Sequence, residues 1–164
     1  MKKGIALLEL LVVIAVMAIL AGLAIPAYNQ WVAKYRVQND TRDIFNALNS
    51  ARIRAFSEKR VCGIVWSNSS KFEIRCDSDN DGDIKDRDDD GYGYDVIQRV
   101  TLVTPFTPVD FTFSKEGFAK DNSTICTNKP EYNSLYNCIK VSSTRIKMGH
   151  YDGGKCDKDH CVAN

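Results

Sequence analysis

One segment, DSDNDGDIKDRDDDG over residues 77–91, has residue types and spacing that could bind a divalent cation. Carboxylates recur on alternate positions, glycine stands sixth and an apolar residue eighth, as in calcium loops that take oxygen ligands from positions one, three and five. A second DxDxDG pattern starts nine residues later. We therefore expect a structural Ca²⁺ site, with candidate ligands Asp77, Asp79, Asp81, Asp83, Asp86, Asp88 and Asp90.

This acidic segment departs from the helix-flanked calcium motif in two ways. Its twelfth position is Asp88, where the motif has a longer glutamate that binds through both oxygens. The residues on either side are expected to form strands rather than helices. The alternative is a solvated acidic loop, because an exposed run of like charges needs no ion.

Another carboxylate, Glu9, stands inside an apolar run from Gly4 to Tyr28 that is otherwise long enough to cross a bilayer. An uncompensated charge at membrane depth costs at least about 2.5 kcal/mol, so Glu9 needs a partner. Lys2 and Lys3 precede the run and predict a cytoplasmic amino terminus. We predict a membrane helix over about residues 5–28; the alternative is a secretory signal peptide cleaved after Ala24.

The helical pattern continues beyond Pro26. Apolar residues recur three or four apart as far as Phe56, and polar residues fill the other face. The sequence thus predicts one helix over about residues 5–59, apolar in its first half and amphipathic in its second. Pro26 removes a backbone hydrogen bond and, with Gly22 one turn earlier, predicts a kink or local melting.

The segment GIALLEL, residues 4–10, resembles the class III signal of type IV pilins and type II secretion pseudopilins, and Pro26 falls where that family commonly has a proline. The resemblance implies that a prepilin peptidase removes residues 1–4 by cutting after Gly4 and that the new terminus, Ile5, is methylated. It also implies that Glu9 pairs with the terminal amine of a neighbouring subunit, which sets one axial stagger because an unpaired buried carboxylate is costly. Ile5 and Ala6 differ from the commoner Phe or Met and Thr.

Residues 60–164 are predicted to form a small antiparallel β-sheet domain, with the acidic segment 77–91 as an insert. Strands are expected over residues 61–66, 71–76, 95–102, 110–114, 123–127, 135–142 and 144–148. A long helix followed by such strands gives an α+β fold. The phrases FTFSKEGFA, STICT and YNCIKVSSTRIKM resemble the carboxy-terminal half of the GspH/FimT-type minor pilins.

Six cysteines beyond a membrane segment predict disulfides formed in an oxidising compartment. Proximity on neighbouring strands, or in sequence, gives the preferred pairs Cys62–Cys76, Cys126–Cys138 and Cys156–Cys161. The alternative is a zinc site from Cys156, Cys161, His160 and His150, although zinc usually takes four ligands with tighter cysteine spacing.

Positive charge gathers between Lys140 and Lys158. The segment TRIK, residues 144–147, resembles the Gly-Arg-x-Arg segment through which some FimT-type minor pilins bind DNA; Arg145 matches, whereas Thr144 and Lys147 depart. Alternation would place Arg145 and Lys147 on one face of a strand, where clustered cations could contact phosphates. The alternative is that these side chains are simply solvated.

No nucleophile elbow, P-loop or HExxH pattern is present in the sequence, so it predicts no enzyme. It predicts a minor pilin or pseudopilin, anchored in a bacterial inner membrane with its amino terminus in the cytoplasm. Other subunits and an inner-membrane assembly platform are the expected partners, in a type IV pilus or type II secretion pseudopilus, at or near its tip. The alternatives are a DNA-binding minor pilin for DNA uptake and an exported calcium-binding domain, anchored or cleaved from its signal.

Overall fold

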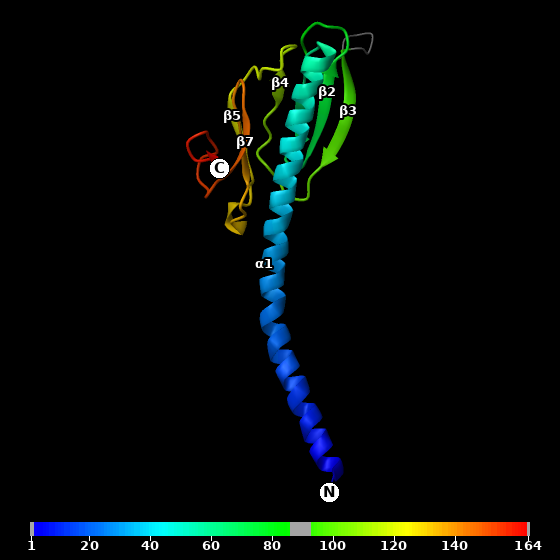
Figure 1. Cartoon of the computed structure of the whole chain (residues 1–164), viewed down its shortest axis with the longest axis vertical. Helices are drawn as coiled ribbons and strands as arrows, with labels where there is room; N and C mark the ends of the chain where they lie inside the picture. The colour runs from blue at the N-terminus through cyan, green and yellow to red at the C-terminus, as the bar shows by residue number, and fades with distance from the viewer. Residues whose placement is uncertain (1, 86–92, 164) are drawn as a thin grey trace. The chain divides into compact units, whose positions relative to one another are not determined.

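A computed structural model describes residues 2–85 and 93–163, so Asp86, Asp88 and Asp90 lie outside the described residues. A single long helix comes first and short strands follow, which is the α+β order expected (Figure 1). The elements are α1 (Lys2–Glu58), β1 (Cys62–Asn68), β2 (Lys71–Asp77), β3 (Tyr94–Thr101), β4 (Phe111–Phe113), β5 (Ser123–Cys126), the 3₁₀ turn η1 (Pro130–Tyr132), β6 (Cys138–Val141), β7 (Ile146–His150) and β8 (Val162–Ala163).

The chain divides into two compact units, Met1–Ala33 and Lys34–Asn164, and α1 contributes to both. In the described part of the first unit, α1 is the whole structure. The helix continues through Gly22 and Pro26 without interruption, so local melting does not occur there. A single missing backbone hydrogen bond is too small a loss to end a helix that is bonded on both sides of it.

The apolar side chains of the first unit are exposed. Among the large apolar side chains from Leu7 to Trp31, the exposed fraction runs from 49% for Val13 to 70% for Leu23. The most apolar window of α1 has a mean hydropathy of 2.8, and none of it is buried. The core helix of a soluble protein would bury such a window, so α1 is long and apolar enough to serve as a membrane anchor.

In the described residues, the strands form two antiparallel four-stranded sheets, where the sequence suggested one. The first has the order β3-β2-β1-β4 and the second β5-β6-β7-β8. Strand β8 was not expected, because two residues are too few to show the alternation that predicts a strand. It pairs with β7 at Gly149, where a Cβ atom would collide with the backbone of Val162.

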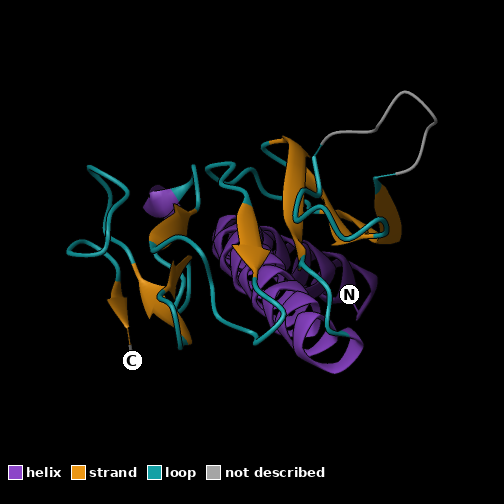
Figure 2. Cartoon of the chain, turned by 90° about the horizontal axis from the view of Figure 1, so that it is seen from above, coloured by secondary structure: helices purple, strands orange, loops and turns teal. Residues whose placement is uncertain are grey.

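Within the second unit, the carboxy-terminal half of α1 packs on both sheets through one apolar core (Figure 2). The helix residues in this core recur three or four apart and so share one face: Val37, Ile44, Ala47, Leu48, Ala51 and Ala55. The first sheet contributes Ile64, Phe72, Ile74, Phe111 and Phe113, and the second contributes Ile125, Ile139 and Val141. The amphipathic pattern therefore predicted Ile44, Leu48, Ala51 and Ala55 correctly, whereas Phe56, at the end of the pattern, is 57% exposed.

A buried carboxylate on the same helix fixes the connection after β3. Asp40 is 5% exposed and accepts hydrogen bonds from the backbone N–H groups of Val103 (3.3 Å) and Thr104 (2.6 Å). These bonds satisfy a charged group that burial would otherwise destabilise. The helix thereby holds the chain segment that leads from β3 to β4.

Candidate functional site

The first candidate site is the exposed apolar surface of α1 in the first unit. Glu9 is the one charged residue among residues 7–33, and its neighbours Leu8 and Leu10 are 65% and 59% exposed. A continuous apolar surface of this kind requires lipid or other apolar helices around it. Gly4 and Ile5, the predicted cleavage site, lie near the start of α1.

The second candidate site is the acidic segment, which is held at both ends of its described part. At its start, the backbone N–H of Asp77 donates to the carbonyl of Val61 at 2.8 Å. At its other end, Ile84 is fully buried against Val61 and Val65. The apolar residue at position eight of the pattern therefore attaches the loop to the first sheet.

Carboxylates organise the backbone between these two points. Asp77 is only 1% exposed. Its two carboxylate oxygens accept hydrogen bonds from the backbone N–H groups of Asn80 (2.6 Å) and Gly82 (2.9 Å). Asn80 and Gly82 adopt the left-handed region, with φ values of 73° and 91°. Glycine adopts this conformation without a steric penalty, so Gly82 makes the sharp turn that the pattern requires at position six.

This turn brings together the first, third and fifth residues of the pattern. One carboxylate oxygen from each of Asp77, Asp79 and Asp81 lies within 4.8 Å of the other two. Oxygens at about 2.4 Å from a shared Ca²⁺ have separations up to about 4.8 Å, so this spacing fits one cation. Asp83 accepts the N–H of Lys85 at 2.8 Å, and it is not part of the group of three carboxylates.

Lysines distant in sequence approach the same loop. The ammonium of Lys115 donates to the Asn80 side chain at 2.7 Å, and that of Lys120 donates to the Gly82 carbonyl at 3.3 Å. Lys85 pairs with Asp110 at 2.7 Å, and its hydrogen bond to that carboxylate raises the pKa of Lys85. These contacts arise because β4 pairs with β1, and local sequence patterns do not predict such a long-range pairing.

The third candidate site is basic. Lys140 on β6 lies directly opposite Lys147 on β7, and the ammonium of Lys140 donates to the Lys158 carbonyl at 2.8 Å. Arg145 was expected on a strand beside Lys147, which is wrong: it lies in the turn before β7. Its backbone exchanges hydrogen bonds with Ser142 at 2.8 and 3.2 Å. Strand β7 therefore begins at Ile146, two residues later than the expected start at residue 144.

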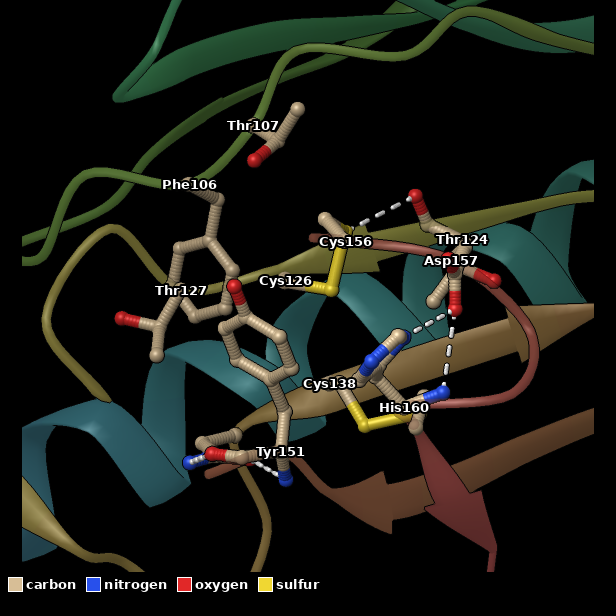
Figure 3. The surroundings of a disulfide bond; sticks show 12 residues. Phe106, Thr107, Thr124, Cys126, Thr127, Cys138, Tyr151, Cys156, Asp157 and His160 are labelled. Atoms are coloured by element: carbon tan, nitrogen blue, oxygen red, sulfur yellow. Dashed lines mark hydrogen bonds and ion pairs between the residues drawn. A yellow bond between two sulfur atoms is a disulfide. The ribbon is translucent and has the colours of Figure 1, made fainter. Parts of the chain in front are cut away.

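All six cysteines form disulfides, but two of the three expected pairings are different. Cys62 is joined to Cys76 as expected. The pairs Cys126–Cys138 and Cys156–Cys161 are wrong, because the structure joins Cys126 to Cys156 and Cys138 to Cys161 (Figure 3). The carboxy-terminal segment lies against the second sheet, so spatial proximity there differs from proximity in sequence.

These disulfides remove the zinc alternative. Cys156 and Cys161 are oxidised and cannot supply the thiolates that a zinc site takes from cysteine. The two histidines have other partners. His160 lies 2.7 Å from the Asp157 carboxylate, and His150 lies 2.6 Å from that of Asp152.

Comparison with known proteins identifies fimbrial proteins as relatives. The chain is 33% identical over 73 residues to the type IV major fimbrial protein FimA of Dichelobacter nodosus, which covers 43% of this chain and 46% of that protein. It is also 23% identical over 158 residues to a fimbrial protein of Pseudomonas aeruginosa, covering 96% and 97% of the two chains. The chain thus spans about half the length of the FimA relatives it matches. No family model and no solved structure matches.

Proposed function

We propose that this chain is a type IV pilin-like protein, as its similarity to fimbrial proteins supports. More closely, we propose a minor pilin or pseudopilin, a structural subunit rather than an enzyme, that assembles through the first half of α1. The observation that carries this proposal is the exposed apolar surface of α1 in the first unit, where Glu9 is the single charge among residues 7–33. Such a surface is satisfied by lipid before assembly and by the helices of neighbouring subunits afterwards.

In this proposal, Glu9 sets the register between neighbouring subunits. A prepilin peptidase cuts after Gly4, and Ile5 becomes a methylated amino terminus that still carries a positive charge. The amine of one subunit then neutralises Glu9 of another. Any other axial stagger leaves both charges unpaired in an apolar medium, at a cost of at least about 2.5 kcal/mol for each.

Mass spectrometry of the native chain from two fractions tests this function: filaments sheared from the cell surface, and washed inner membranes. A chain that starts at methylated Ile5 in the sheared fraction supports a surface pilus. The same terminus confined to membranes supports a pseudopilin. A chain that starts at Ile25 contradicts the proposal and favours an exported domain that has lost a signal peptide.

The finer assignment, a minor subunit at or near the tip, is supported by the resemblance of the carboxy-terminal half to GspH/FimT-type proteins. It predicts that sheared filaments contain far less of this chain than of their most abundant subunit. Peptide quantification against labelled standards measures this ratio. A ratio near one would instead make this chain the principal subunit of its filament.

We also propose that the acidic segment binds one structural Ca²⁺. The support is the convergence of the Asp77, Asp79 and Asp81 carboxylates, which repel one another unless a cation lies between them. An ion there would order the loop against the first sheet, to which Ile84 already attaches it. Limited proteolysis of the full chain in detergent, with Ca²⁺ or with chelator, tests this; equal cleavage of residues 77–91 in both would contradict it.

A second candidate function is DNA binding for uptake, in a subunit at the filament tip. The observation that favours it is the directly opposed pair Lys140 and Lys147, because like charges across a strand pair are destabilising without an anion nearby. Changing Arg145 and Lys147 to alanine should weaken binding of a DNA duplex and flatten its salt dependence. Changing Lys59 and Lys71 to alanine removes the same charge elsewhere and serves as the control. Equal affinity in both variants would exclude this surface.

A further inference from the structure

Four cysteines of the second sheet lie in one cluster (Figure 3). Cys126, at the end of β5, faces Cys138, at the start of β6, directly across the strand pair. Cys161 is buried beside them, and Cys156 packs against the same cluster. The disulfides nevertheless join each strand cysteine to the carboxy-terminal segment and not to its direct neighbour.

The first sheet also has two cysteines directly opposite each other on neighbouring strands, but there they are bonded to each other. There, Cys62 faces Cys76 across β1 and β2, and the two are bonded to each other. The Cα atoms of Cys62 and Cys76 are 4.0 Å apart, and directly opposed residues generally place theirs about 4.5–5.5 Å apart. Most disulfides span about 4.4–6.8 Å, and the Cys62–Cys76 bond shows that a direct cross-strand pair in this chain is also bridged. A Cys126–Cys138 bond is therefore compatible with the β5–β6 pair.

Compared with the two final pairs, chain entropy favours that direct bond while the chain is still unfolded. Cys126 and Cys138 are 12 residues apart, whereas the pairs found in the structure have separations of 30 and 23 residues. If closure falls with the three-halves power of loop length, the direct pair meets about four times as often as Cys126–Cys156 and about three times as often as Cys138–Cys161. The two strand cysteines also come first in the chain, so they are available before their final partners.

We propose that Cys126–Cys138 is the first disulfide of the second sheet, and that Cys156 then resolves it by exchange. The first bond forms when a dithiol–disulfide oxidant accepts two electrons and two protons from the two thiols. The thiolate of Cys156 attacks the Cys126 sulfur; the Cys126–Cys156 bond forms and Cys138 leaves as a thiolate. A second equivalent of the same oxidant then joins Cys138 to Cys161.

Cys156 is the attacking residue because it is the more accessible of the two carboxy-terminal cysteines. Cys161 is 2% exposed, whereas Cys156 is only partly buried. Burial in apolar surroundings disfavours the thiolate, which is the nucleophile in exchange. The sulfur of Cys156 also lies 3.5 Å from the carbonyl oxygen of Thr124, on the strand that carries Cys126.

The exchange controls when the carboxy-terminal segment becomes fixed. Residues 152–163 are tied to the sheet by both final disulfides, and this segment includes β8. A chain arrested with Cys126–Cys138 has neither tie. The proposal concerns maturation of the domain and holds whether or not the chain assembles into a filament.

A time course of oxidative refolding tests the order of bonds. The full chain is reduced in detergent and then exposed to oxidised glutathione. Samples are quenched with acid, which protonates thiolates and stops exchange, and are then alkylated. Digestion needs cleavage at Glu131 as well as at lysine, because Lys129 precedes a proline. Mass spectrometry then distinguishes the disulfide-linked peptides, with Cys62–Cys76 as the internal control.

The expected result is a Cys126–Cys138 peptide that rises first and then falls as Cys126–Cys156 rises. Its decay should be about tenfold faster at pH 7.5 than at pH 6.5, because the thiolate fraction of a thiol with a pKa of about 8.5 changes tenfold. Direct appearance of the final pairs with no such peptide would overturn the proposal, and so would a decay rate that does not depend on pH.

A variant tests the proposal without requiring exchange. With Cys156→Ser and Cys161→Ser together, Cys126 and Cys138 should form a disulfide quantitatively. The Cys62–Cys76 bond in the same molecules reports that oxidation took place. If Cys126 and Cys138 stay reduced while Cys62–Cys76 forms, the direct bond is not accessible and the proposal fails.

Discussion

The two units of this chain use apolar residues in opposite ways. In the first unit, α1 exposes its leucines, isoleucines and valines, and no sheet is present in the described residues to cover them. In the second unit, the same helix buries one apolar face against two sheets, and its other faces are mostly polar, with Ile53 and Phe56 as exposed exceptions. The first unit therefore depends on an apolar environment from outside the chain, whereas the second supplies its own interior.

This difference explains why two carboxylates of α1, Asp40 and Glu9, have such different surroundings. Asp40, in the second unit, is buried and receives hydrogen bonds from Val103 and Thr104 of the same chain. For Glu9, the proposed partner is the amine of another subunit. A charge satisfied within the chain stabilises a fold, and a charge left for another chain determines how the chains align.

The largest expected difference between the two units is in the loss of unfolding free energy when a leucine of α1 is changed to alanine. Leu48 is fully buried in the second unit, so Leu48→Ala should lower the free energy of unfolding of that unit by about 2–5 kcal/mol. Leu20 is 61% exposed, so Leu20→Ala should change it by less than about 0.5 kcal/mol. Urea titration in detergent, followed by Trp66 fluorescence in a Trp31→Phe background, measures both; equal effects would contradict the division.

The next largest effect is expected in assembly. Glu9→Ala leaves a neighbouring amine unpaired, so incorporation into sheared filaments should fall about a hundredfold, the equivalent of roughly 2.7 kcal/mol. Membrane insertion should be unchanged. The control is Glu58→Ala, which removes an exposed carboxylate that pairs with Arg54 and Arg60 at the other end of the helix. Immunoblots of sheared and membrane fractions report both, and normal incorporation of Glu9→Ala would remove the register role.

Patterns within short stretches of the sequence predicted those features that depend on interactions between nearby residues. The helix, its buried face, the β1–β2 hairpin with Cys62–Cys76, and the turn at Gly82 all follow from residues close together in sequence. The division into two sheets and the crossed disulfides depend on where the carboxy-terminal segment lies against the second sheet. The lysines near the acidic loop depend on the β1–β4 pairing. These are long-range contacts that carry no periodic signal in the sequence.

The acidic segment tests whether the second unit also depends on a component from outside. Asp77→Asn keeps one side-chain oxygen and loses the other as an acceptor, so either Asn80 or Gly82 loses its partner. The free energy of unfolding should fall by about 1–3 kcal/mol, and the stabilisation by Ca²⁺ should disappear. Asp83→Asn is the control, because Asp83 lies outside the group of three carboxylates. Thermal unfolding with Ca²⁺ and with chelator measures both; a Ca²⁺ response retained in Asp77→Asn would contradict the site.

The smallest effect is expected from acid at the carboxy-terminal segment, which the second unit holds by its own bonds. A hydrogen bond from His160, together with its backbone N–H, lowers the pKa of the Asp157 carboxyl from its ordinary 3.8 to about 2. Because the folded-state pKa is the lower one, the ionised carboxylate stabilises the segment above about pH 4. This contribution is lost as the pH falls toward 2.

Hydrogen exchange at residues 157–161 should therefore accelerate between pH 4 and 2 in the natural chain, beyond the intrinsic pH dependence of exchange. The acceleration should be weaker in Asp157→Asn, whose side chain does not titrate. The exposed Asp159→Asn variant is the control and should follow the natural chain. Identical profiles for the two variants would show that the two disulfides alone hold this segment.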